Sequence, residues 1–138
     1  MQKIVLISCV KSKAAYKAKA KKLYISPWFK QAYKYALTLE PDRIFILSAK
    51  HKLLNPEKKI DPYETTLNTM SSAQIKAWAA TVIEQLERRT NLSTDHFIVL
   101  ASERYRKWLL PHLHSCEVPM RGLTIGRQLH WLNERVPA

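Results

Sequence analysis

Three short runs of apolar residues stand out along the chain, and polar residues bound each of them. The runs are Ile4 to Ile7, Ile44 to Leu47 and Phe97 to Leu100. Continuous runs of this kind, without alternation, are typical of strands buried on both faces of a parallel sheet. A fourth candidate, Cys116 to Val118, precedes Pro119 and is therefore expected at a sheet edge. The pattern predicts three buried parallel strands with a weaker fourth.

Helical spacing of apolar residues is clearest over residues 71–89. Ser71 and Gln74 have the spacing of a capping box, which begins a helix. The apolar positions that follow recur at the helical period and predict one buried face: Ile75, Trp78, Ala79, Val82, Ile83 and Leu86. We therefore expect an amphipathic helix over this range.

Three further helices are predicted. Ser26 before Pro27 is a good start for a helix whose inward face would consist of Phe29, Tyr33, Ala36 and Leu37. A helix capped by Ser102 and ending near Pro111 would bury Tyr105, Trp108 and Leu109. The last helix, from about Thr124, would bury Ile125, Leu129, Leu132 and Val136.

Strands that alternate with helices favour right-handed crossovers and a three-layer α/β fold. We expect a single domain over residues 1–138, with a mainly parallel sheet of about four strands and helices on both faces. Two irregular stretches interrupt the pattern, Lys11 to Ile25 and Lys50 to Met70. Loops of this length in a compact domain are usually functional or disordered.

Composition agrees with one globular domain, because 46% of the 138 residues are hydrophobic and 25% are charged. No apolar stretch approaches the roughly 18 to 20 residues of a membrane-spanning helix, and the first apolar run is too short for a signal peptide. Two cysteines are too few for a disulfide framework. We expect a soluble, cytoplasmic protein that does not bind membranes.

Motifs for cofactors and metals are missing from the sequence. Gly122 and Gly126 are its only glycines, so the P-loop and dinucleotide-binding fingerprints are absent. Cys9, Cys116 and the five histidines do not combine at a zinc-binding spacing. We expect neither a cofactor nor a metal ion.

Positive charge is concentrated in the first part of the sequence. The formal net charge is +12, from 23 Lys and Arg against 11 Asp and Glu, and the first acidic residue is Glu40. A polyanion is the natural partner, because neutralising phosphates releases condensed counterions. The alternative is a solvated lysine face that aids solubility. We predict that nucleic acid binds through Lys17, Lys19, Lys21, Lys22, Lys30 and Lys34.

Small polar and charged residues follow each predicted strand. They are Ser8, Cys9, Lys11 and Lys13 after the first, Ser48, Lys50 and His51 after the second, and Ser102 and Arg104 after the third. Ligands of open α/β sheets bind beyond the carboxyl ends of the strands, so these exits predict one anion-binding pocket. The alternative for each single serine is that it merely ends a strand or caps a helix.

Several of these residues are candidates for catalysis. His51 is suited to proton transfer, although it would serve equally as a hydrogen-bonded loop residue. Cys9 is either a nucleophile among lysines or a buried structural cysteine. Tyr63 stands in a turn between Asp61 and Glu64 and is expected to stack on a base. Its tripeptide, Asp-Pro-Tyr, also occurs in the water-activating motif of uracil-DNA glycosylases.

The chain resembles a family of small, mostly uncharacterised bacterial and phage proteins over nearly its full length. The matching stretches are 7–13, 23–29, 46–51, 62–63, 102–105 and 122–129. From these stretches and their neighbours we expect further substrate contacts from Tyr24, Ser26, Arg121, Gly126 and Gln128. One departure is Lys52, which stands where the relatives usually carry glycine; lysine tolerates a positive φ poorly.

Two better-described families are more distantly similar. Residues 48–63 resemble the peroxide-stress protein YaaA family, for which DNA binding is reported. The Cys9 region resembles the lysine-bearing domain of archaeosine synthase, in which the lysine is the nucleophile. That resemblance implies a nucleophilic role for Lys11 or Lys13.

Our leading hypothesis is an enzyme that acts on a base or nucleoside, free or in nucleic acid, at the base or its N-glycosidic bond. Lys11, Lys13 and Arg104 would hold phosphate or developing negative charge. His51 would transfer a proton, and Asp61 or Glu64 would either activate water or stabilise positive charge on a sugar. The alternatives are a non-catalytic, basic nucleic-acid-binding module and, on charge alone, a partner of an acidic protein.

Overall fold

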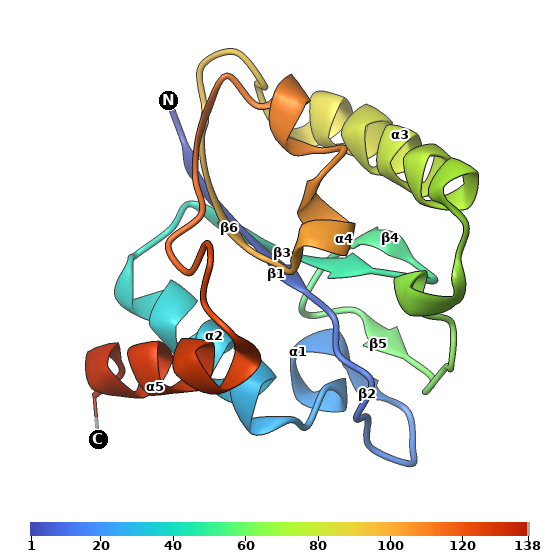
Figure 1. Cartoon of the computed structure of the whole chain (residues 1–138), viewed down its shortest axis with the longest axis vertical. Helices are drawn as coiled ribbons and strands as arrows, with labels where there is room; N and C mark the ends of the chain where they lie inside the picture. Colours follow the sequence, from blue (N-terminus) through green and yellow to red (C-terminus); the bar gives the residue numbers. More distant parts are fainter. Residues whose placement is uncertain (138) are drawn as a thin grey trace.

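Five strands form the central sheet of the computed structural model. The structure describes residues 1–137. The last residue of the domain predicted over 1–138 lies outside the described residues. Figure 1 shows the whole chain, and the strand order of its central sheet is β4-β3-β1-β6-β7. The parallel strands are β1 (Lys3–Ser8), β3 (Arg43–Ser48), β6 (His96–Leu100) and β7 (Ser115–Glu117). β4 (Lys52–Leu54) is antiparallel to β3 at the opposite edge.

The three predicted buried strands are confirmed. β1 lies in the middle, where Ser8 pairs with Leu47 of β3 and Ile7 pairs with Leu100 of β6. All three strands therefore end at one edge of the sheet. The weaker fourth strand is β7, and it lies at the sheet edge as its proline predicted. The antiparallel β4 was not predicted.

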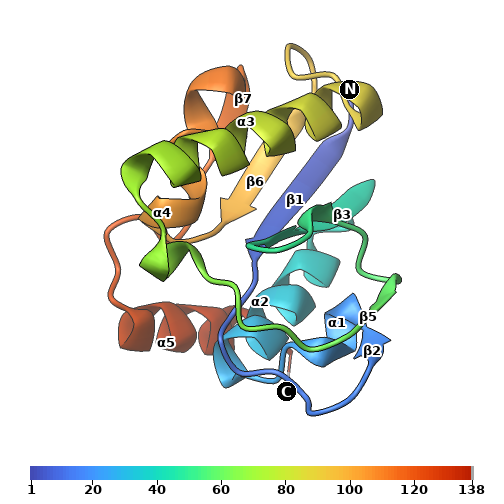
Figure 2. The ribbon, with the colours of Figure 1, turned by 90° about the vertical axis from the view of Figure 1, so that its right-hand side faces the viewer.

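Helices cover both faces of this sheet, so the predicted three-layer α/β fold is confirmed. Helices α2 (Pro27–Thr38) and α5 (Ile125–Arg135) lie on one face. Helices α3 (Ser72–Arg89) and α4 (Glu103–Arg106) lie on the other, as the second view shows (Figure 2). Over residues 1–137, none of the helices has the length and apolar character needed to cross a membrane.

Helix α3 agrees closely with its sequence pattern. The Ser71 hydroxyl accepts the Gln74 backbone N–H at 3.2 Å, and the Gln74 side chain accepts the Ser71 backbone N–H at 2.8 Å. This reciprocal capping box satisfies two backbone donors that the helix itself leaves unpaired. All six predicted inward residues of α3 are buried.

Three predictions about the other helices are wrong in detail. Leu37 is 54% exposed, because the buried stripe of α2 runs through Trp28, Phe29, Ala32 and Ala36. Ile125 is 64% exposed, because it lies in the first turn of α5 beside an open pocket. Helix α4 has only four residues, because Leu109 donates its N–H to Arg106 three residues back, which tightens the chain into turns.

The two irregular stretches contain short elements that join them. The first holds β2 (Ala18–Lys19) and α1 (Ala20–Leu23), and the second holds β5 (Lys59–Ile60) and the 3₁₀ turn η1 (Leu67–Thr69). β2 and β5 pair antiparallel as a small second sheet. A further 3₁₀ turn, η2 (Leu110–His112), precedes β7.

Candidate functional site

The strand order reverses at the middle of the sheet. The chain passes from β1 to β3 on one side of β1 and then crosses over to β6 and β7 on the other side. The crevice beyond the carboxyl ends of β1 and β6 is therefore the topological switch point, where open α/β sheets bind their ligands. Ser8 and Cys9 follow β1 there, and Ser102 follows β6.

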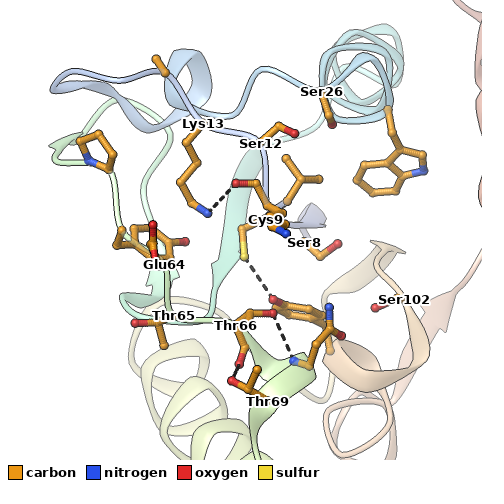
Figure 3. Close-up of a pocket in the computed structure, with 18 of the residues that line it drawn as sticks. Ser8, Cys9, Ser12, Lys13, Ser26, Glu64, Thr65, Thr66, Thr69 and Ser102 are labelled. Carbon is orange, nitrogen blue, oxygen red and sulfur yellow. Dashed lines mark hydrogen bonds between the residues drawn. The ribbon is translucent and has the colours of Figure 1, made fainter.

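A pocket of about 1290 Å³ opens at this crevice. Figure 3 shows Ser8 and Cys9 near its middle, with Lys13 and Glu64 on one side and Ser102 on the other. Hydroxyl and amide side chains form most of the remaining polar lining: Ser12, Ser26, Thr65, Thr66, Asn68, Thr69 and Gln128. The volume lies above the roughly 300 to 1,000 Å³ of common small-molecule sites, so the pocket has room for a small-molecule ligand.

Backbone hydrogen bonds hold Lys13 at the pocket wall. The Ile25 N–H donates to the Ser12 carbonyl at 3.1 Å, and the Ala14 N–H donates to the Leu23 carbonyl at 2.8 Å. Residues 12–14 thus pair with residues 23–25 as a short antiparallel bridge centred on Lys13. The lysine side chain is therefore positioned by regular pairing although it belongs to an irregular stretch.

The Lys13 amine is half-buried among aromatic and polar groups. Its Nζ lies 4.5 Å from the centre of the Tyr63 ring and donates to the Lys11 carbonyl at 3.2 Å. Burial lowers the pKa of the Lys13 ammonium, and the charge of Glu64 partly opposes that shift. More of this amine is neutral near pH 7 than for an exposed lysine.

Tyr63 forms part of the pocket floor and is only 8% exposed. Its hydroxyl lies 2.6 Å from the Tyr24 hydroxyl and 2.8 Å from the Ser48 hydroxyl, which also accepts the His51 backbone N–H at 2.9 Å. Burial raises the pKa of both phenols, so they stay neutral. The sequence predicts a turn here, and within it Tyr63 is a packed residue because its hydroxyl has buried partners.

Cys9 is also buried and has a partner inside the protein. Its Sγ lies 3.4 Å from the Tyr105 hydroxyl, and the Tyr105 ring packs edge-on against Trp78 with centroids 5.5 Å apart. Burial raises the pKa of the Tyr105 phenol. This packing agrees with the structural alternative for Cys9, although the residue does border the pocket.

A hydrogen-bonded brace joins the helices at another wall of the pocket. The Trp28 indole N–H donates to the Gln128 side-chain oxygen at 3.0 Å, and the Gln128 amide nitrogen donates to the Leu123 carbonyl at 2.8 Å. Gln128 was predicted to contact substrate. It lines the pocket, and its amide oxygen and nitrogen hold the start of α5 against the start of α2.

The structure brings nine of the predicted site residues to the pocket: Ser8, Cys9, Lys11, Lys13, Ser26, Tyr63, Glu64, Ser102 and Gln128. The predicted meeting of the first and third strand exits is therefore present. Ser48, from the second strand exit, is fully buried behind Tyr63. Tyr24 is buried in the same way.

Six other predicted site residues do not line the pocket: His51, Asp61, Lys50, Arg104, Arg121 and Gly126. His51 packs edge-on against the opposite part of Tyr63, with ring centroids 5.4 Å apart. Burial, together with the ammonium groups of Lys50, Lys58 and Lys52, lowers the pKa of His51. The imidazole therefore contacts a residue of the pocket without lining the pocket itself.

Other residues of the pocket were missed by sequence reasoning. They are mainly Trp28, Thr65, Thr66, Asn68, Thr69 and Tyr105. A signal existed for four of them, because a polar run directly follows the Pro62-Tyr63 turn. Thr66 orders this run by accepting the Asn68 N–H at 3.2 Å, which begins η1.

A carboxylate from elsewhere in the chain lies beside the lysine-rich region, although the sequence of that region contains none. Glu57, from the second irregular stretch, lies 3.2 Å from Lys19 and also pairs with Lys21. Hydrogen bonding in this cluster lowers the pKa of Glu57 and raises that of Lys21.

In the part of the chain that the structure describes, no three His, Cys, Asp or Glu side chains lie close enough together to hold a metal ion.

Comparison with known proteins gives a family for this chain. A family model described as a family of unknown function, DUF6884, matches residues 4–134. No curated protein and no solved structure matches the chain. The expected membership in an uncharacterised family is confirmed. Because the match spans nearly the whole sequence, the chain belongs to this family of unknown function, DUF6884.

Proposed function

We propose that the protein is an enzyme that acts on a base or nucleoside, free or within nucleic acid, at the base or its N-glycosidic bond. The observation that carries this proposal is the Lys13 amine. It is half-buried, has a lowered pKa and borders a polar pocket at the switch point of the sheet. Perturbed groups in such clefts are characteristic of functional sites.

Lys13 is the nucleophile or base in this proposal. A desolvated lysine reacts as the neutral amine, and the lowered pKa raises the fraction in that form. At a glycosidic bond, Nζ forms a bond to C1′ of the sugar while the bond from C1′ to the base breaks. The base leaves with the electron pair of that bond, and the Glu64 carboxylate, in the same pocket, accepts the proton that Nζ loses and passes it to the base. Water then attacks C1′ and displaces Nζ, and the proton that the water loses passes through Glu64 to the regenerated amine.

The other catalytic candidates have weaker support. Glu64 borders the pocket, whereas Asp61 and His51 do not, so water activation or proton transfer is assigned to Glu64. Lys11 is exposed at the same pocket and is suited to holding phosphate. Tyr63 supports the Lys13 amine through its ring. Contact with the Lys13 amine thus replaces base stacking as the proposed role of Tyr63.

The choice between Lys11 and Lys13, which the sequence left open, is made on burial. Lys13 is half-buried and Lys11 is exposed, so the proposal assigns the nucleophile to Lys13.

The test is incubation of the purified protein with cellular nucleic acids and nucleosides, followed by mass spectrometry for a modified or released base. Lys13→Gln is expected to lower turnover by about 100-fold or more, since it removes the reacting amine. Lys58→Gln is the matched control, because it removes an exposed ammonium that does not border the pocket. Turnover should rise with pH through a midpoint below the usual lysine pKa of about 10.4.

Two results would contradict the proposal. One is a Lys13→Gln variant that is folded by thermal unfolding and as active as the parent protein. The other is the absence of any changed base from DNA, RNA or nucleosides with the parent protein. In either case Lys13 would be a structural residue of the pocket wall.

A specific observation favours the second candidate, a basic nucleic-acid-binding module without catalysis. Lys17, Lys22, Lys30 and Lys34 are exposed, and none of them pairs with a carboxylate within residues 1–137. Free ammonium groups of this kind bind phosphates and release counterions. The salt dependence argued in the Discussion tests this candidate.

A further inference from the structure

The N-termini of two long helices border the pocket. Ser26 and Trp28 of α2 line it, as do Ile125 and Gln128 of α5. The first backbone N–H groups of a helix have no partner within the helix, and the helix dipole makes that end positive. Neither first turn contains an acidic residue that would neutralise it.

The caps of both helices leave part of these donors free. The Ser26 hydroxyl accepts the Phe29 N–H at 3.1 Å, and the Thr124 hydroxyl accepts the Arg127 N–H at 3.3 Å. The remaining first-turn donors of α5, at Ile125 and Gly126, are not used by these caps. The brace between Trp28 and Gln128 keeps the two helix starts together.

Ser8 supplies an independent sign of a ligand in this part of the pocket. It ends β1, is 5% exposed and borders the pocket. Its hydroxyl has no hydrogen-bond partner among residues 1–137. No fully buried polar side-chain atom of residues 1–137 lacks a partner, so this unpaired hydroxyl of a nearly buried residue is accessible from the cavity, where a bound group can pair with it.

Ser102 adds a second free hydroxyl. We predicted that it caps the helix that follows, and it does stand at the N-cap position of α4. Its side chain nevertheless makes no cap hydrogen bond, and it borders the pocket instead. The hydroxyls of Ser8 and Ser102 are thus both available to a ligand at the switch point.

We infer that the Ser8 hydroxyl and the N-termini of α2 and α5 form a subsite for the phosphate group of a nucleotide. The Ser8 hydroxyl and the free first-turn N–H groups donate to phosphate oxygens, as helix N-termini do elsewhere. The ammonium groups of Lys11 and Lys13 border the same pocket and favour a negative ligand. This inference rests on the proposed function, because it specifies the substrate as phosphorylated.

The experiment is a titration of the full-length, ¹⁵N-labelled protein followed by NMR in phosphate-free buffer. The probes are inorganic phosphate, the four common ribonucleosides and deoxyribonucleosides, and their 5′-monophosphates. Inorganic phosphate is expected to shift the amide signals of Trp28, Ile125 and Gly126. The best monophosphate should bind at least about tenfold more tightly than its nucleoside, because a hydrogen bond to a charged group is a strong one.

Ser8→Ala isolates the subsite. It should reduce phosphate affinity about tenfold and leave nucleoside affinity unchanged. Thermal stability should not fall, because the hydroxyl has no partner in the protein to lose. Ser12→Ala, which removes another hydroxyl of the same pocket, should leave phosphate affinity unchanged. Ser8→Asp, which adds a negative charge there, should abolish phosphate binding.

The outcomes separate this inference from the proposed function. Equal affinity for nucleoside and monophosphate would overturn the subsite, and so would phosphate binding that survives both Ser8 variants. If nucleosides still bind in these cases, the proposed function of the pocket stands. Phosphate binding that depends on Ser8, without binding of any nucleoside or nucleotide, would uphold the anion subsite and overturn the nucleotide substrate. Failure of every probe at millimolar concentration would overturn both.

Discussion

Tyr63 connects the irregular parts of the chain to the sheet through one hydroxyl group. That hydroxyl contacts Tyr24 in the first irregular stretch and Ser48 at the end of β3, and the ring lies beneath the Lys13 amine. One buried side chain therefore fixes both the loop that carries the amine and the floor on which it rests. A loop residue of this kind belongs to the core as much as to the site.

Replacing Tyr63 with phenylalanine should lower the free energy of unfolding by about 2 kcal/mol, because it removes two buried hydrogen bonds and leaves their partners unsatisfied. The ring beneath Lys13 remains, so the reactivity of the amine should change little. Chemical denaturation measures the first effect, and turnover of the identified substrate measures the second.

Tyr16→Phe is the control for that substitution, because Tyr16 is 71% exposed. Its stability should stay within about 0.5 kcal/mol of the parent protein, as for most surface changes. Equal stability of the Tyr63→Phe and parent proteins would show that the hydroxyl chain does not hold the loops.

The turn between β3 and β4 adopts a backbone conformation that its sequence does not favour. Lys52 has φ of +61°, in the left-handed region, while it pairs with Ser48 as the first residue of β4. A glycine at this position would adopt this conformation without strain. Lysine does not prevent the turn, because the pairing of β3 with β4 and the Ser48 bond to the His51 N–H hold it in place.

Lys52→Gly should raise the free energy of unfolding by about 0.5 to 1 kcal/mol, because glycine avoids the left-handed penalty but gains entropy in the unfolded chain. Lys52→Ala keeps a Cβ atom and should bring no such gain. Denaturant midpoints of the two variants decide the point. A gain of the same size from alanine would mean that removal of a charge, and not backbone conformation, is responsible.

Long elements were predictable from local pattern, and short ones were not. The apolar runs of β1, β3 and β6 and the capped, periodic α3 carry enough residues to reveal their period. β2, β4 and β5 have two or three residues each and are defined by their partners instead. The exposed side of Leu37 depends in the same way on where α2 packs, which no local pattern contains.

The pocket was predictable only where strand ends define it. Ser8, Lys13 and Ser102 follow buried strands or lie close behind them, so topology brings them together. The wall from Thr65 to Thr69 folds back from a distant connection, and its approach depends on tertiary contacts such as the Tyr63 hydroxyl bonds. His51 was placed in the site because it follows a strand, yet it packs edge-on against the Tyr63 ring and does not line the pocket.

The net charge of +12 acts on the whole molecule, and the fold modifies its distribution. Glu57 neutralises part of the cluster by pairing with Lys19 and Lys21. Lys17 and Lys22, which lie next to these residues in the sequence, remain free of such pairs within residues 1–137. The lysines of the predicted binding region are therefore not equivalent.

Affinity for a DNA or RNA oligonucleotide should fall steeply with salt, because each contacted phosphate releases counterions. A double variant in which glutamine replaces both Lys17 and Lys22 should have a slope of log affinity against log salt that is smaller by about two. Glu57→Gln should act in the opposite direction, since it frees the ammonium groups of Lys19 and Lys21. Binding titrations at several salt concentrations measure both effects.

The double variant Lys19→Gln, Lys21→Gln is the matched control for the Lys17 and Lys22 variant. It should change the salt slope less, because Glu57 already pairs with both of these lysines. A slope near zero in the parent protein, or no binding at low salt, would exclude nucleic acid as the partner of this surface. The charge would then serve solubility alone.

The central position of β1 also has a consequence for how the chain is made. Both partners of β1 follow it in the sequence, since Ile4 pairs with Arg43 and Lys3 pairs with His96. At the usual rate of synthesis, the apolar strand waits roughly 5 to 20 seconds on the ribosome before its second neighbour exists. Pairings so distant in sequence also form slowly. β1, which is buried in the folded protein, is thus the strand that stays unpaired longest during synthesis. During that time it is available to aggregate or to bind chaperones.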